Sequence, residues 1–232
     1  MRFPSRIYRG AFTLLETLSV IVILVVLLGL IIPMMSHAAK SANSAKCAAN
    51  LRQIGTGLLL YANENGGIFP PTTHTTGSRR IEESWIYGIA DYLDNVDQVR
   101  VCPADPPKRR KRIIEQRGSS YALNDLVFDN LEYHQIYRIP IRSRTILAFI
   151  LSENRTPSRT WDHVHADEWS AWNFVLNDVE VDRHRTGSRA GNRLKGSANY
   201  LFADGHVENI SAVEFKSSFD RGINPAEVPQ MP

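Results

Sequence analysis

Cysteine is scarce in this sequence, which has two cysteines among 232 residues. That number is too small for a disulfide-framework mini-protein and for a structural zinc site built from four cysteines. A glycine-rich phosphate loop, a Gly-x-Ser-x-Gly nucleophile motif and internal repeats are also absent from the sequence. Carboxylates and histidines are present, but no spacing assigns them acid and base roles. The sequence therefore predicts no enzyme and no cofactor.

An excess of charge of either sign is missing from most of the chain. The net charge of +3 comes from 27 basic and 24 acidic side chains, and the three arginines of residues 1–11 account for it, because no acid accompanies them. The remainder is balanced, so the overall charge gives no reason to expect nucleic-acid binding. With 43% hydrophobic and 22% charged residues, the chain has the composition of a folded protein.

One long hydrophobic run is present, over residues 14–32. Its only clearly polar members are Glu16, Thr17 and Ser19. A helix of this length nearly matches a hydrocarbon core of about 30 Å, at a rise of about 1.5 Å per residue. Because arginines precede the run, the positive-inside rule predicts a single-pass protein with its N-terminus in the cytoplasm.

Three interpretations of this segment compete. A cleaved secretory signal peptide would use the small-x-small triplet at residues 36–38. An uncleaved signal anchor would need no cleavage site. Neither explains Glu16, because a carboxylate in a membrane helix costs up to roughly 3 kcal/mol on insertion and usually has a function and a partner.

The third interpretation follows from residues 9–16, Arg-Gly-Ala-Phe-Thr-Leu-Leu-Glu, which resemble the type IV prepilin signature. In that family a basic leader ends in a small residue, usually Gly. A Phe follows, then three mostly hydrophobic or small residues, then Glu, and prepilin peptidase cuts before the Phe and methylates the new amine. The resemblance implies processing between Ala11 and Phe12, and an assembly role for Glu16, which would pair with the Phe12 amine of a neighbouring subunit. Pro33 stands where these proteins often have a helix-kinking proline.

Two alternatives stay open for the same residues. Cleavage after Gly10 would make Ala11 the first residue and shift Glu16 by one position. The Glu16 side chain would also be accommodated by snorkelling to the membrane interface.

Beyond Pro33, a stripe of Leu51, Ile54, Leu58 and Tyr61 at spacings of three and four predicts a helix that runs from about Phe12 to Tyr61. Four segments are expected: a cytoplasmic leader, a transmembrane assembly helix, the outer half of the helix and an extracytoplasmic domain, at residues 1–11, 12–33, 34–65 and 66–232.

The outer domain has the turn-rich pattern of a small sheet domain. A short helix is predicted at 81–92, strands at 136–141 and 145–151, and a hairpin at 198–210 with a two-residue type I′ turn at Asp204-Gly205. The predicted fold class is α+β. A long N-terminal helix, membrane-spanning in its first half, packs on a C-terminal, mainly antiparallel sheet domain as in pilins.

A narrower resemblance covers both ends and the middle of the chain. Residues 47–55, 102–105 and 198–207 are similar to a group of bacterial prepilin-like proteins that is labelled by His, nine residues and Asp-Gly. Its members are described as pseudopilin-like or type II secretion-like, without an established activity. Here Leu194 occupies the motif's histidine position, and the expected counterpart is His184, which 19 intervening residues separate from Asp204 and Gly205. Either the extra residues loop out, or a contact between His184 and the Asp204 turn is lost.

The two cysteines lie in the part predicted to leave the cytoplasm, where disulfides persist. Pairing Cys47 with Cys102 would close a loop of about 55 residues, worth roughly 4 kcal/mol in the chain-entropy model. The alternatives are two separate thiols, or a Cys47 that pairs between subunits.

Other chemical candidates are weaker. His163 and His165 would share a face in a strand and hold zinc, if His184 or His206 supplied a further ligand, but a polar loop explains them equally. Calcium would need oxygens from Asp178, Asp182 and Asp204, and no ligand ladder specifies such a site.

Two features of the sequence suggest surface roles. The basic run at 108–112 would bind phosphate backbones, but a solvated loop is the simpler interpretation. A cluster of tryptophans would form a carbohydrate-stacking surface, or it would pack in the core or at a subunit interface; its members are Trp161, Trp169 and Trp172.

Together these patterns predict a prepilin-like structural subunit of the bacterial inner membrane, assembled into a pilus or a type II secretion pseudopilus. The expected partners are prepilin peptidase, identical or related pilin-like subunits and inner-membrane lipid, with no nucleic acid. The alternatives are a membrane-tethered extracytoplasmic binding module, for example for carbohydrate, that forms no filaments, and an envelope enzyme with an unrecognised site.

Overall fold

A computed structural model describes residues 13–77, 80, 83–155, 161–184 and 193–231. The chain divides into two compact units, residues 1–39 and 40–232. The helix α1, Leu14–Glu64, belongs to both and confirms the long N-terminal helix. It continues through Pro33, and it ends where Gly66 and Gly67 adopt φ angles of +66° and +86°, which glycine tolerates best.

The first unit contains the beginning of α1. All of its described large apolar side chains, from Leu14 to Met35, are exposed. The sequence predicts that this half crosses a membrane, yet no helix among the described residues is both long and apolar enough to do so. The membrane-spanning role of residues 12–33 therefore stays a prediction.

In the second unit, the outer half of α1 buries one face. Cys47, Leu51, Ile54, Leu58 and Ala62 follow one another at spacings of four and three and have no exposed surface. This is the stripe that the helical period predicts, and it forms part of the single core of the domain.

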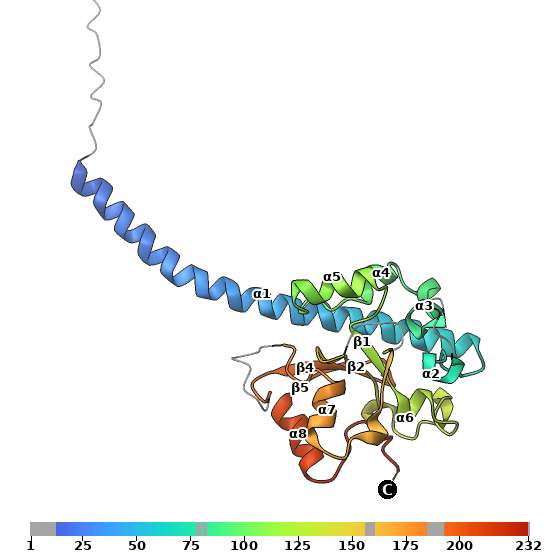
Figure 1. Ribbon diagram of the computed structural model, residues 1–232. Helices are drawn as coiled ribbons and strands as arrows, with labels where there is room; N and C mark the ends of the chain where they lie inside the picture. The colour runs from blue at the N-terminus through green and yellow to red at the C-terminus, as the bar shows by residue number, and fades with distance from the viewer. Residues whose placement is uncertain (1–12, 78–79, 81–82, 156–160, 185–192, 232) are drawn as a thin grey trace, which may run out of the picture. The chain divides into compact units, whose positions relative to one another are not determined.

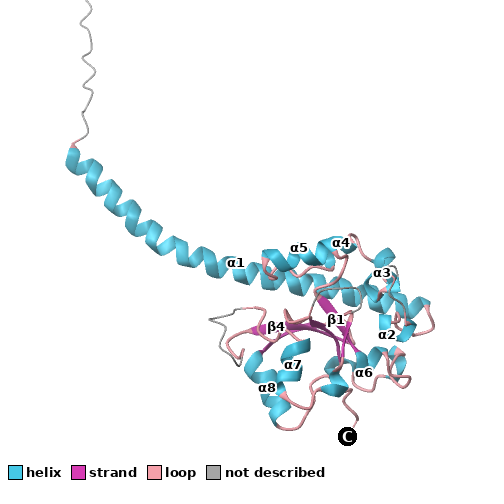
Figure 2. Cartoon of the chain, viewed as in Figure 1, coloured by secondary structure: helices cyan, strands magenta, loops and turns pink. Residues whose placement is uncertain are grey.

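A five-stranded sheet is the centre of the second unit (Figure 2). Its strand order is β3-β1-β2-β4-β5, and every neighbouring pair is antiparallel except the parallel pair β1–β3. The strands are β1 Tyr121–Asn124, β2 Ile146–Ile150, β3 His163–Val164, β4 Ser197–Phe202 and β5 Val207–Ser211. The fold is thus α+β with a mainly antiparallel sheet, as predicted.

Helices cover both faces of this sheet (Figure 1). From β4, Leu201 reaches towards Gly55 of α1 on one face, whereas the ring of Tyr200 stacks on Phe215 of α8 on the other, with centroids 5.0 Å apart. The helices after α1 are α2 Thr73–Thr76, α3 Trp85–Gly88, α4 Val96–Val99, α5 Pro107–Glu115, α6 Asp125–Phe128, α7 Trp172–Asp178 and α8 Ala212–Asp220. Short 3-10 turns occupy Ala90–Tyr92, Ile136–Arg138, Arg142–Arg144 and Ala166–Glu168.

Two local predictions were wrong. Residues 136–141 form no strand, because Ile136 and Ile139 are buried through a 3-10 turn and Pro140 cannot donate to a ladder. The β4–β5 connection is also longer than a two-residue turn. Gly205 N donates to Phe202 O and Phe202 N donates to His206 O, both at 2.9 Å, which leaves a three-residue loop.

The side chain of Asp204 explains this longer loop. Its Oδ1 accepts a hydrogen bond from the His206 backbone N–H at 3.1 Å, which is the local turn that aspartate favours. Only the glycine of the Asp204-Gly205 pair has a positive φ, at +89°, whereas a type I′ turn needs two. The hairpin prediction was right in place and strand pairing, and wrong in turn type.

Candidate functional site

Histidines and aspartates gather where β1 and β3 end. These two strands are parallel, with Leu123 opposite His163, so the residues that follow them meet at one edge of the sheet. α6 begins there with Asp125, and His165 follows β3 directly. Three more residues come from α2, from the end of α6 and from a 3-10 turn. Together they form what we call the histidine–aspartate cluster: His74, Asp125, Asp129, His163, His165 and Asp167.

The cluster is compact enough to hold a cation. Ligand atoms of His74, Asp129 and His163 lie within 4.8 Å of one another, and so do those of a second group, Asp125, His165 and Asp167. The rings of His163 and His165 have centroids 4.8 Å apart. His163 and His165 thus lie side by side, and the residues beside them are His74 and aspartates instead of His184 or His206; zinc binding by the two histidines stays a prediction.

Asp162 positions the buried end of the cluster. Its carboxylate accepts hydrogen bonds from Thr73 N and Thr73 Oγ1, at 3.0 and 2.7 Å, and lies 2.8 Å from His163 Nδ1. Burial alone would lower the pKa of His163, but the charge and hydrogen bond of Asp162 outweigh burial and raise that pKa. The other ring nitrogen, Nε2, is buried without a hydrogen-bond partner.

Carboxylates crowd the open end of the cluster. Burial, with a smaller contribution from Asp167, raises the pKa of Asp125 to about 7. Asp125 Oδ1 accepts a hydrogen bond from Ala166 N at 2.9 Å. A cavity of about 350 Å³ opens over Asp125, Asp129 and His165. The cluster can thus bind a divalent cation or a small cationic group, and it can hold a proton near neutral pH.

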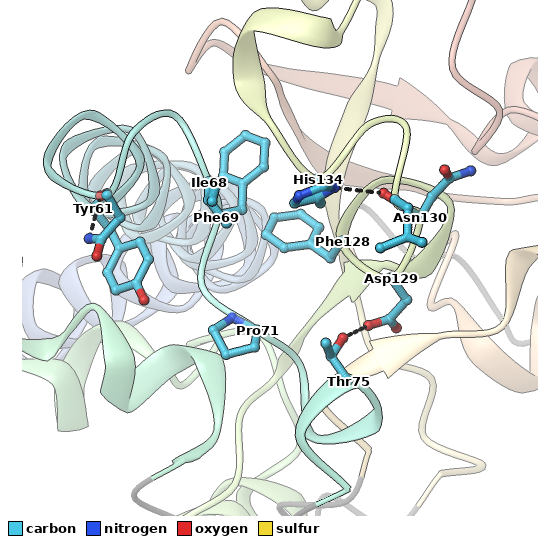
Figure 3. A pocket seen from close by; sticks show the side chains of 11 residues that line it. Tyr61, Ile68, Phe69, Pro71, Thr75, Phe128, Asp129, Asn130 and His134 are labelled. Carbon is cyan, nitrogen blue, oxygen red and sulfur yellow. Dashed lines mark hydrogen bonds between the residues drawn. The ribbon is translucent and has the colours of Figure 1, made fainter.

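An apolar pocket of about 350 Å³ adjoins the cluster and shares Asp129 with it (Figure 3). Its walls include Tyr61 from α1, Phe69 and Phe128, and the two phenylalanine rings have centroids 4.9 Å apart. Asp129 is held at the rim by hydrogen bonds from Thr72 and Thr75. An apolar cavity with a few polar groups at its edge suits a small organic ligand.

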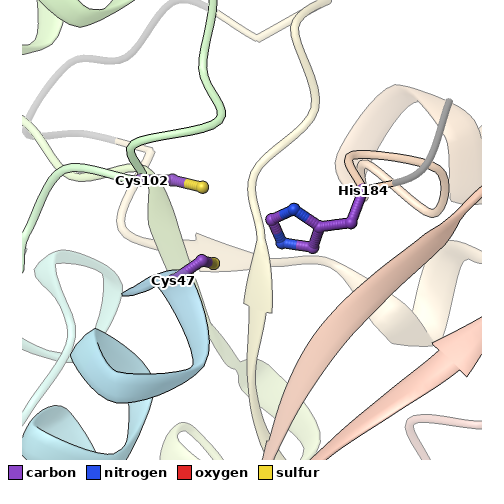
Figure 4. Close-up of side chains that lie close together, drawn as sticks. All are labelled: Cys47, Cys102 and His184. Carbon is purple, nitrogen blue, oxygen red and sulfur yellow. The ribbon is translucent and has the colours of Figure 1, made fainter. Parts of the chain in front are cut away.

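A second cluster lies inside the domain and consists of Cys47, Cys102 and His184 (Figure 4). Both cysteines are buried free thiols, so the predicted disulfide stays a prediction. Burial alone would raise the pKa of Cys47, but the neighbouring Cys102 and His184 side chains lower it to about 5. Burial and the neighbouring Cys47 together raise the pKa of Cys102.

The three residues of the C-terminal motif do not come together. His184 pairs with Ser197 at the start of β4, where each backbone N–H donates to the other's carbonyl at 2.7 and 2.8 Å. Asp204 and Gly205 follow the opposite end of β4, about 20 Å away for a strand of six residues. The contact between His184 and the Asp204 turn is therefore absent in this chain.

Glu16 has a local role that the sequence analysis missed. Its carboxylate accepts hydrogen bonds from Thr13 N at 2.8 Å and Thr13 Oγ1 at 2.9 Å, and Glu16 N donates to Thr13 Oγ1 at 3.2 Å. This reciprocal pair is a capping box, and the signal for it was present as Thr-x-x-Glu at the start of an apolar run. Ala11 and Phe12, the expected processing site, lie outside the described residues.

The basic run at 108–112 is not a solvated loop but part of α5. Arg109 is buried and donates to the carbonyl oxygens of Leu151 and Arg155, each at 3.1 Å. One of its five charges is thus committed to the fold, which weakens the idea of a phosphate-binding strip.

The remaining candidates serve packing and ion pairs. Trp169 is buried and donates to Asp178 Oδ2 at 3.0 Å, in agreement with core packing instead of a sugar platform. Asp178 and Asp182 pair with Arg155 and Arg193, at 2.6 and 2.7 Å. Two of the three carboxylates considered as calcium ligands are therefore engaged by arginines.

Comparison of the chain with protein-family models, with curated proteins and with solved structures found no match.

Proposed function

We propose that this chain is a prepilin-like structural subunit. Prepilin peptidase cleaves it between Ala11 and Phe12, and α1 assembles with identical or related subunits into a pilus or a type II secretion pseudopilus. The second unit is then an extracytoplasmic pilin-like domain without an enzymatic role.

The observation that supports this proposal is the different exposure of apolar side chains in the two parts of α1. The described apolar side chains from Leu14 to Met35 are exposed, whereas the apolar face from Cys47 to Ala62 is buried in the domain. An apolar helix surface of this length is stable in lipid or against other apolar helices, and it is unfavourable in water. A helix whose C-terminal part is packed in its domain and whose N-terminal part exposes apolar side chains suits a subunit that moves from the membrane into a filament.

The membrane step rests on the sequence. Residues 14–32 are almost entirely apolar and follow a leader with three arginines and no acid. In the proposal, the new subunit waits in the inner membrane with its N-terminus in the cytoplasm, and its domain lies in the periplasm or in the filament.

Glu16 is expected to act twice. In the single subunit its carboxylate caps α1 through Thr13. In the filament it pairs with the positive amine of Phe12 of the next subunit, and such buried charge pairs fix register better than they add stability.

Two substitutions separate these roles. Glu16→Gln keeps a capping-box side chain but removes the charge, and Glu16→Ala removes both. Both variants should stay in the membrane fraction, because a costly charge is lost. Both should fall by about tenfold or more in filaments sheared from cells with the prepilin machinery, because stranding one member of a buried pair costs about 3–5 kcal/mol.

Ser19→Ala is the matched control for this experiment, since it removes a polar group one turn away and leaves the carboxylate in place. It should assemble normally. Recovery of Glu16→Gln in filaments at the wild-type level would show that capping, and not charge pairing, is the function of Glu16.

A membrane-tethered binding module is the second candidate. The apolar pocket favours it, because Tyr61 and Phe128 offer ring faces and Asp129 offers a hydrogen-bond acceptor at the rim. This arrangement would suit a sugar or another small amphipathic ligand. A mature chain that stays in the membrane fraction and never enters filaments would favour this candidate over the first.

A further inference from the structure

Three distant segments converge on one buried point. Cys47 lies on α1, Cys102 on the loop between α4 and α5, and His184 on the segment that pairs with β4. Figure 4 shows the imidazole ring facing the two sulfur atoms. A ring nitrogen and both Sγ atoms lie within 4.8 Å of one another, and the three residues are exposed by 0, 0 and 2%.

We propose that Cys47, Cys102 and His184 bind a zinc ion. Zinc takes thiolate and imidazole ligands in a tetrahedral arrangement at about 2.0–2.3 Å, which places neighbouring ligand atoms about 3.5–3.8 Å apart. That spacing lies inside the limit of 4.8 Å that the three side chains meet. The fourth position is left for a water molecule.

A second, independent feature of His184 points to a missing ligand. Its Nδ1 is buried with no hydrogen-bond partner, which is costly inside a protein. Nε2 is 3.2 Å from the Asn199 side-chain amide nitrogen, and that amide donates to Ser44 O at 2.9 Å. Asn199 therefore orients the ring while the ring lacks a complete set of partners, as a metal ligand with a second-shell contact would.

Charge and softness favour zinc over the ions that suit the histidine–aspartate cluster. Two cysteines that lose their protons on binding carry two negative charges, which neutralise Zn²⁺ in a buried site. Thiolates bind zinc or copper(I) in preference to calcium or magnesium, which take oxygen ligands. The zinc site would fasten α1 to the domain, and it excludes a Cys47–Cys102 disulfide in the same molecule.

The test uses the full chain, purified in detergent without chelators. Elemental analysis should find about one zinc per chain. Cys102→Ser and His184→Gln should lose this metal, whereas His206→Gln, an exposed histidine at the β4–β5 loop, should retain it. Zinc retained by both site variants, or no zinc in the wild type, would overturn the proposal.

A measurement on the wild type keeps the test valid if the variants fail to fold. Cells are quenched in acid, and the protein is denatured in the presence of a chelator and treated with an alkylating reagent. The mass of the chain is then measured by mass spectrometry. Both cysteines should carry the alkyl group, because zinc protects thiols without oxidising them. If the chain carries no alkyl group before reduction and gains two when it is reduced and alkylated again, the two cysteines form a disulfide, which would contradict the zinc site.

Discussion

Arg183→Met should destabilise the second unit, residues 40–232, by about 3–5 kcal/mol, since removing one partner of a buried ion pair leaves the remaining charges less compensated. The Arg183 side chain is 5% exposed. Its guanidinium lies close to three carboxylates, those of Asp105 at 3.2 Å, Glu153 at 2.5 Å and Glu180 at 3.2 Å. Methionine fills similar space but leaves these acids without their shared cation.

Urea unfolding of the full chain in detergent, followed by tryptophan fluorescence, measures this effect at pH 7. Arg221→Met, at an exposed arginine after α8, should change stability by less than about 0.5 kcal/mol. A deficit for Arg183→Met that is as small as this control would refute the network's role.

The second large effect is expected where α1 meets the domain. Leu58 is fully buried, whereas Leu60 on the same helix is 43% exposed. Leu58→Ala should cost about 2–5 kcal/mol, because it removes buried methyl groups and leaves a cavity. Leu60→Ala makes the same chemical change on the open face and should cost about 0.5 kcal/mol or less.

The same unfolding measurement compares the two leucine variants. Equal losses would mean that the outer half of α1 is not part of the cooperative unit, and that the domain folds without it. A larger loss of unfolding free energy for Leu58→Ala than for Leu60→Ala would support the view that this part of α1 folds together with the domain. Asn50 of α1 also contacts the rest of the domain, because its side-chain amide donates a hydrogen bond to Val101 O at 3.1 Å.

Periodic features of the sequence predicted structure well. The stripe from Leu51 to Tyr61 predicted the outer half of α1, and the apolar residues at 145–151 predicted β2, because each pattern matches the period of one element. Local chemistry predicted less. The run at 136–141 resembles a strand in composition, but Pro140 and the burial of every third residue produce a 3-10 turn.

The candidate sites depended on contacts that no local pattern contains. His163 and His165 were identified as a pair, yet His74 joins them from α2, which lies about 90 residues earlier in the chain. The two cysteines lie close together, as the predicted disulfide requires, but no local pattern placed His184 beside them. The sequence left open whether His184 contacts the Asp204 turn. The Thr13–Glu16 capping box corresponds to a local Thr-x-x-Glu pattern in the sequence, whereas the assembly role of Glu16 rests on the prepilin resemblance.

The proposed function depends on processing of this chain as a prepilin, and the N-terminus of the mature protein reports that processing. The full chain is expressed in a bacterium with prepilin peptidase, isolated from the membrane fraction and analysed by mass spectrometry of its N-terminal peptide. The mature chain should begin at Phe12 and carry a methyl group on its α-amine. A mature chain that begins at Ala39, or an uncleaved chain that still begins with residues 1–11, would rule out processing as a prepilin.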